Sequence, residues 1–170
     1  MARKLVVLAL MTAIGFSLYG CKTVKNVVCK ERAYKLKVVA DDSFVATTTV
    51  QVDFVAANAA DLPRWQNLAV DSYRGGGKDV YSMSFGQGKP SVQALEAEVE
   101  LWERWLARNV THVFVIATIP GMLSEGALGP ADARMVELPL DECRWEGTPG
   151  MLKVSLGVTG LRVESPQKPL

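Results

Sequence analysis

The stretch FVATTTVQVDFVAA, residues 44–57, decides the fold. It is rich in Val, Thr and Phe, residue types that favour extended backbone. Because successive side chains of a strand point to opposite faces, Val50, Val52 and Phe54 share one face. The pattern predicts a long strand with one face in a hydrophobic core.

Further strand patterns lie on both sides of this segment. Residues 34–39 alternate between apolar and charged, which is typical of a half-buried strand. Residues 111–119 (THVFVIATI) are apolar on both faces, which indicates a central strand covered on both sides. Turn signals separate these segments from the other predicted strands, which span residues 80–85, 135–140 and 151–158.

Two segments predict helices. In residues 91–108, apolar side chains recur at alternating spacings of three and four residues, which predicts one long amphipathic helix capped by Ser91. This stripe consists of Val92, Leu95, Val99, Trp102 and Leu106. A shorter helix is predicted after Asp61, with Pro63 in its first turn.

Together these elements predict a mainly β protein, an antiparallel β-sandwich with one long and one short helical insertion. Strands and helices do not alternate regularly, which makes a Rossmann-type parallel sheet the second choice. The 170 residues suit one domain, and 49% apolar with 22% charged residues is ordinary for a globular protein. With 19 Lys and Arg against 18 Asp and Glu, a nucleic-acid partner is not expected.

The N-terminus has the features of a targeting segment. Arg3 and Lys4 form a short positive region, residues 5–18 carry no charge, and small Gly20 precedes Cys21. This order predicts a secretory signal peptide over residues 1–20. The apolar run is shorter than the roughly 20 residues that a transmembrane helix needs.

The ending Leu18-Tyr19-Gly20-Cys21 resembles the lipobox of bacterial lipoproteins. In that family the Cys thiol receives a diacylglyceryl group, the signal is cut before the Cys, and the new amine is acylated. The resemblance implies that Cys21 anchors the chain to the lipid bilayer of the cell envelope. Lys22 in place of Asp implies, in a Gram-negative host, an outer-membrane position facing the periplasm. The alternative is an ordinary secretory signal with a chance Cys.

The remainder of the chain divides into three parts. Residues 21–33 are short and basic and are predicted to tether the lipidated end, residues 34–164 to form a single β-sandwich domain, and residues 165–170 a flexible tail. Outside the cytoplasm, two thiols in a folded domain often pair, so Cys29 and Cys143 are candidates for a disulfide. The alternative is two separate thiols, one buried and one in the tether.

The sequence predicts no catalytic site, no cofactor and no metal site. Residues 74–78 (RGGGK) lack P-loop spacing, and Asp79 follows them, so they predict a surface loop. His112, the single His, has no second His to form a metal site and is predicted to be a partly buried strand residue. The glutamates within residues 91–108 fit a solvated helix face.

Three tryptophans, Trp65, Trp105 and Trp145, have no clear place in an apolar stripe. Tryptophan is enriched in binding hot spots because it supplies a large rigid surface at low entropic cost. These three residues are therefore candidates for contact with a protein partner or with the membrane surface.

The combination of a lipobox, a short tether and a sandwich domain resembles the small outer-membrane lipoprotein of type VI secretion systems. The local similarity lies in residues 50–54 leading to Leu62, Trp65 and Leu68, in residues 113–117, and in the segment ending at Arg144-Trp145. The resemblance implies a transthyretin-like sandwich that anchors an envelope-spanning complex. The helix predicted over residues 91–108 departs from that family's usual pattern.

The sequence leaves three alternative functions for this protein. The first is a non-enzymatic structural or interaction module of the envelope that binds the bilayer through Cys21 and an envelope protein partner. The second is a periplasmic ligand-binding lipoprotein that uses the Gly-rich loops 74–79 and 121–130 as a mouth. The third is an enzyme, which would require a cleft holding a strongly perturbed acid or base.

Overall fold

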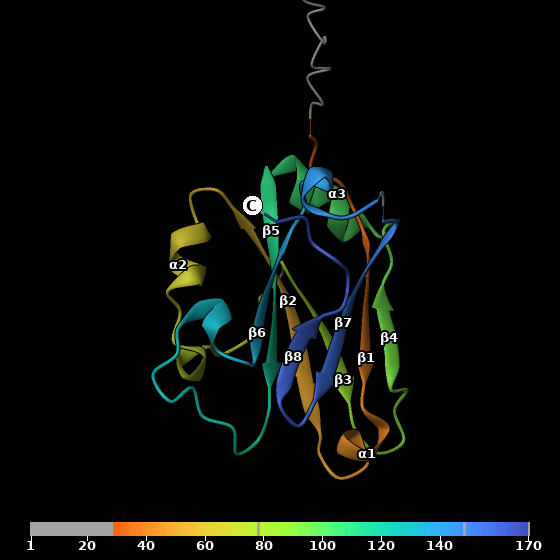
Figure 1. Cartoon of the computed structure of the whole chain (residues 1–170), viewed down its shortest axis with the longest axis vertical. Helices are drawn as coiled ribbons and strands as arrows, with labels where there is room; N and C mark the ends of the chain where they lie inside the picture. The colour runs from red at the N-terminus through yellow and green to blue at the C-terminus, as the bar shows by residue number, and fades with distance from the viewer. Residues whose placement is uncertain (1–28, 78, 148, 170) are drawn as a thin grey trace, which may run out of the picture.

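The computed structural model describes residues 29–77, 79–147 and 149–169. The predicted signal peptide and Cys21 lie outside the described residues. The described part is mainly β: two four-stranded sheets pack as a sandwich with a few short helices, which confirms the predicted fold class (Figure 1). Among these residues no helix is both long and apolar enough to cross a membrane.

The first sheet has the strand order β3-β2-β5-β6, and every neighbouring pair in it is antiparallel. Its two central strands come from the segments 44–57 and 111–119 in which strands were predicted, and Val52 lies opposite Ala117 in their ladder. The strands are β2 (Val50–Asn58), β3 (Val80–Phe85), β5 (Val110–Thr118) and β6 (Met135–Pro139).

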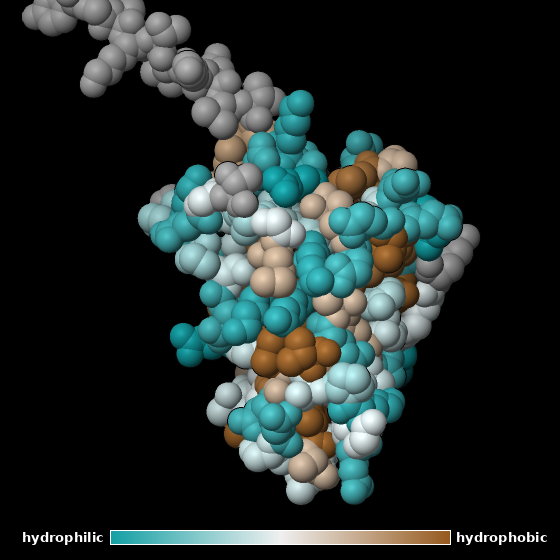
Figure 2. Space-filling model, turned by 90° about the vertical axis from the view of Figure 1, so that its right-hand side faces the viewer, coloured by the Kyte–Doolittle hydropathy of each residue, from teal (hydrophilic) through white to brown (hydrophobic). Residues whose placement is uncertain are grey.

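The second sheet has the order β4-β1-β7-β8, and its edge strand β4 lies on the side of the molecule that Figure 2 shows, where hydrophilic surface is mixed with smaller apolar areas. Its central pair, β1 with β7, runs parallel, with Val38 opposite Val154, which corrects the expectation of a wholly antiparallel sandwich. Between β1 and β7 the chain passes through all four strands of the other sheet. A connection of that length allows two neighbouring strands to run parallel or antiparallel. The strands are β1 (Lys35–Ala40), β4 (Val92–Leu95), β7 (Met151–Gly157) and β8 (Gly160–Val163).

The long helix predicted over residues 91–108 is wrong in its first half. Residues 92–95 form strand β4, and the helix α3 spans only Glu100–Ala107. A spacing of three places two side chains on opposite faces of a strand. Accordingly Val92 is 48% exposed, whereas Leu95 is fully buried. Backbone hydrogen bonds to β1 stabilise the extended conformation of residues 92–95 more than the helical spacing of their apolar side chains favours a helix.

One further boundary differs from prediction, at the start of the strand expected over residues 44–57. The predicted strand of residues 44–57 begins only at Val50, because a helical turn, α1 (Asp42–Val45), precedes it. The Asp41 carboxylate caps this turn by accepting hydrogen bonds from the amides of Ser43 and Phe44 at 2.8 and 3.1 Å. The predicted short helix is confirmed as α2 (Leu62–Gln66).

The main core fills the space between the sheets. It includes Leu36, Val52, Phe54 and Val115, each at most 1% exposed. A second, smaller cluster covers the outer face of the β3-β2-β5-β6 sheet, where Trp65 and Leu68 pack near the buried Phe114. Strand β5 is apolar on both faces because it contributes to both clusters.

Candidate functional site

A disulfide joins Cys29 to Cys143 across a sequence separation of 114 residues, with the two Cα atoms 5.5 Å apart. Neighbouring contacts strengthen this junction: Glu31 forms a β-bridge with Asp141, and Arg32 lies 3.6 Å from the Glu142 carboxylate. Residues 29–33, predicted as part of the tether, are therefore attached to the domain. In Figure 1 they enter at the end that carries α3, and α1 lies at the opposite end.

The end of the chain closes on the same region. Gln167 forms a bridge with Trp145, and the amide of Lys168 donates to the carbonyl of Arg144 at 3.0 Å. These bonds attach residues 167 and 168, which belong to the predicted flexible tail, to the domain. Both ends of the described chain are fixed near the short 3-10 turn Glu142–Arg144.

Two of the three candidate tryptophans are buried. Trp105 and Trp145 are 0% exposed, and their indole Nε1 atoms donate to the carbonyls of Asp79 at 3.2 Å and Pro139 at 2.9 Å. Trp105 also packs edge-on against Trp102, at 5.0 Å between ring centroids. This burial removes Trp105 and Trp145 from the candidate contact residues, which corrects the prediction.

The third tryptophan, Trp65, is half-buried on the outer face of the β3-β2-β5-β6 sheet. Its ring centroid lies 6.0 Å from that of Phe114 in a stacked arrangement and 6.3 Å from that of Tyr73. The Arg64 guanidinium lies over the ring at 5.4 Å, within the range of a cation–π contact. Trp65 therefore keeps a surface that solvent or a ligand reaches.

Beneath this region lies a buried carboxylate that sequence reasoning missed. Asp53 is 1% exposed and accepts hydrogen bonds from Gln51 Nε2 at 2.9 Å, Ser82 Oγ at 2.6 Å and Tyr73 Oη at 3.0 Å. Burial, together with the Asp53 charge and hydrogen bond, raises the pKa of Tyr73 well above its usual range. The only sequence signal was an acid within a strand that otherwise consists largely of apolar residues.

A second polar cluster, also missed, holds the segment after β5. Buried Arg134 donates to both carboxylate oxygens of Asp132, at 3.0 and 2.7 Å, and to Asp71 and the Met122 carbonyl at 2.7 and 2.8 Å. Burial alone would raise the pKa of Asp132, but the bonds from Arg134 outweigh it, and that pKa lies below its usual value. The same bonds raise the pKa of Arg134.

His112 lies in β5 and is partly buried, as predicted. Its Nε2 is 3.4 Å from a Glu137 carboxylate oxygen. Burial lowers the pKa of His112 despite the nearby carboxylate, so the neutral ring is favoured.

Within the described ranges, one set of metal-type donors comes together: Cys29, Asp141 and Cys143. Because the two sulfur atoms are bonded to each other, they do not act as thiolate ligands there.

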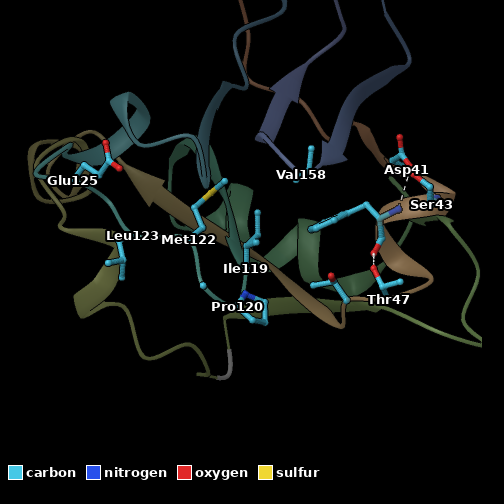
Figure 3. A pocket seen from close by; sticks show the side chains of 12 residues that line it. Asp41, Ser43, Thr47, Ile119, Pro120, Met122, Leu123, Glu125 and Val158 are labelled. Carbon is cyan, nitrogen blue, oxygen red and sulfur yellow. Dashed lines mark hydrogen bonds between the residues drawn. The ribbon is translucent and has the colours of Figure 1, made fainter.

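A hollow of about 720 Å³ lies at the α1 end of the sandwich. Figure 3 shows Ile119 and Met122, from the segment after β5, beside Val158, from the β7–β8 turn, and the α1 region. Leu123 and Val158, both in its lining, are 74% and 73% exposed. Asp41 and Glu125 are the charged residues in the lining, and both are acidic. We call this feature the far-end hollow.

The two Gly-rich loops do not share one mouth. Residues 121–123 and 125 line the far-end hollow, whereas residues 74–76 line a different hollow beside Trp65, and the two linings have no residue in common. The loops nevertheless lie near each other, because Ser124 Oγ donates to the Asp71 carboxylate at 2.7 Å.

Comparison with known proteins gives likenesses among solved structures. No protein-family description matches the sequence, and no curated protein matches it. Among solved structures, the chain is similar to the Lip protein of Serratia marcescens, a membrane-bound component of the type VI secretion system. The two chains are 13% identical with a TM-score of 0.44, and the match covers 81% of this chain and 99% of that one.

Proposed function

We propose that the chain is a lipid-anchored lipoprotein of the bacterial cell envelope that acts as a non-enzymatic structural and interaction module. The observation that carries the proposal is the sequence LYGC at residues 18–21, placed after a short positive region and an uncharged apolar run. Residues 1–20 would be removed as a signal peptide, and Cys21 would carry the acyl chains. Several chains on one residue hold a protein to a bilayer far more firmly than one.

The disulfide supports a position outside the cytoplasm. Disulfides persist in oxidising compartments and are rare where glutathione and thioredoxin keep thiols reduced. The bond between Cys29 and Cys143 is built into the junction of the chain start with the domain. It therefore agrees with export across the inner membrane.

The same bond limits how far the domain can move from its anchor. Cys29 lies eight positions after Cys21, so the link spans at most roughly 26–29 Å when fully extended. The end of the sandwich that carries α3 would face the bilayer, and the far-end hollow would point into the periplasm (Figure 1). A partner protein could reach it there.

We assign the partner contact to the far-end hollow and to a protein segment that bears apolar and basic side chains. The exposed side chains of Leu123 and Val158 supply apolar area, and Asp41 and Glu125 supply negative charge. The most specific form of this proposal is anchoring of a type VI secretion complex to the outer membrane, with Lys22 directing the chain to that membrane.

Lipid attachment is tested by replacing Cys21. The C21S variant should move from the membrane fraction to the soluble periplasmic fraction, and its N-terminal peptide should lose the mass of the acyl chains. The Y19A variant changes the most tolerant lipobox position and should remain acylated. An unacylated Cys21 in the unaltered chain, or an uncut leader, would contradict the proposal.

Partner contact is tested by reversing the surface chemistry of the hollow. In the host, the L123K and V158K variants should lose at least nine-tenths of their cross-linking to envelope proteins while remaining in the membrane fraction. The V92K variant serves as a matched control, because Val92 is also exposed but lies on edge strand β4. Equal loss in all three variants would contradict the assignment.

A further inference from the structure

The hollow beside Trp65 has the features of a small-molecule site, and nothing in the proposed anchoring role requires it. It has a volume of about 430 Å³, within the range of ligand pockets. Trp65, Leu68 and Val80 supply its apolar lining, and Arg64 and Arg74 stand at its edge. We call it the tryptophan hollow.

Its walls are held in place before any ligand arrives. Trp65 is fixed between Phe114 and Tyr73, and the Tyr73 hydroxyl is bonded to buried Asp53. The loop backbone approaches that same carboxylate: a Cβ at Gly75 would lie 3.0 Å from Asp53 Oδ2, and Gly75 has a φ of +65°. Only glycine adopts this conformation at low cost. A preorganised wall reduces the entropic cost of binding.

The charged residues that line the tryptophan hollow are both basic. Arg64 and Arg74 are the charged residues in its lining, and neither guanidinium pairs with a carboxylate among the described residues. Most other arginines in the described ranges do have such a partner, namely Arg32, Arg104, Arg108, Arg134 and Arg162. Asp53 does not line the hollow, and its charge is compensated by three hydrogen-bond donors.

Residues that line the hollow carry several hydrogen-bond donors. Arg74 is steadied by bonds from its Nη1 to the carbonyls of Asp71 and Tyr73 at 2.7 and 3.3 Å, and its remaining N–H groups stay available. Within the described residues, the amides of Gly75 and Gly76 donate to no protein acceptor. A ligand rich in acceptor oxygens would satisfy both sets of donors.

We infer that the tryptophan hollow binds a carboxylated saccharide. The guanidinium fork matches a carboxylate in geometry and charge, and the apolar lining that Trp65 shares with Leu68 and Val80 suits the apolar face of a sugar ring. This inference does not depend on acylation of Cys21, so either proposal can fail without the other.

The test compares two sugars that differ by one acid group. N-acetylmuramic acid carries a lactyl carboxylate, and N-acetylglucosamine is the same ring without it. The full chain in detergent micelles should bind N-acetylmuramic acid saturably, measured by calorimetry and by Trp fluorescence, with at least tenfold higher affinity than N-acetylglucosamine. The disaccharide of the two sugars should bind at least as tightly if the natural source is a glycan end, and more weakly if it is a free monosaccharide.

Variants locate the binding. The R64Q/R74Q double variant should weaken binding of N-acetylmuramic acid at least tenfold while keeping its melting temperature, because both side chains are exposed. R162Q is the matched control, since Arg162 is an exposed arginine of β8 outside this hollow, and it should change nothing. Absence of saturable binding, equal affinity for both sugars, or equal loss in R162Q would overturn the inference.

Discussion

The two faces of the β3-β2-β5-β6 sheet are built from the same strands but differ in chemistry. The inner face packs against the other sheet and is filled by apolar side chains such as Val52, Phe54 and Val115. In the part of the chain that the structure describes, the outer face is covered by α2 and the loops around it, and Asp53 lies beside a small apolar cluster there. A face that is completely covered contributes stability, whereas a face that is partly covered keeps hollows and polar groups that can bind.

The largest expected effect lies on the inner face. Phe54 is fully buried, so F54A should destabilise the domain by about 3–5 kcal/mol through lost burial and the cavity left behind. Denaturant unfolding of the disulfide-bonded chain measures this. V92A, at the exposed Val92, should cost much less. A loss below about 1 kcal/mol in F54A would contradict the contrast between the faces.

The next effect concerns the polar cluster beside the outer face. R134M leaves Asp132, which is 3% exposed, without its charged partner, and we expect a loss of about 3 kcal/mol. Because the pKa of Asp132 is lowered in the folded state, the stabilisation it brings is present above the ordinary value of 3.8 and is lost as the pH falls below it. Unfolding curves between pH 3 and 7 should show this loss in the native chain.

In R134M the pH dependence below pH 4 should become shallower, because the bonds that lower the Asp132 pKa are gone. R162Q is again the matched control, since Arg162 is exposed and lies 3.8 Å from the Glu164 carboxylate. A surface pair of this kind contributes about 0–1 kcal/mol. Equal destabilisation in both variants would mean that burial of Arg134 has no special role.

The smallest effect concerns His112 on the outer face of β5. Its pKa lies below the ordinary value of 6.5, so the unfolded chain binds a proton more readily than the folded one. Stability should therefore decrease modestly as the pH falls from 7 to 5, and H112Q should remove that part of the slope. Unfolding at several pH values measures it. An unchanged slope in H112Q would assign the dependence to other groups.

The sequence predicted the inner face well and the outer face poorly, for a physical reason. Alternation along residues 50–54 and the run of apolar residues 111–119 report burial directly, and both strands are present. The spacing of apolar residues does not indicate which polar side chains, far apart in the sequence, bind each other. The pairing of Arg134 with Asp71 and of Tyr73 with Asp53 depends on loop paths that no local pattern encodes.

The error at residues 91–108 has a related origin. Val92 and Leu95 satisfy a helical spacing, yet they belong to a short strand whose hydrogen bonds come from β1, more than fifty residues earlier. The indole groups of Trp105 and Trp145 find backbone acceptors inside the domain, which residue type alone does not indicate. For the tryptophan hollow, the sequence signals were the run of glycines at 75–77 and Arg74 before it.

The bond between Cys29 and Cys143 also determines how a mechanical load would pass through the molecule. If Cys21 is anchored as proposed, tension from the bilayer would enter the described domain at Cys29 and be divided between the start of β1 and the segment that leads to β7. Because β1 and β7 run parallel and share six residue pairs, pulling on both from the same end places no shear on the hydrogen bonds between them. The domain would transmit tension from the bilayer to its opposite end without its strands peeling apart one at a time.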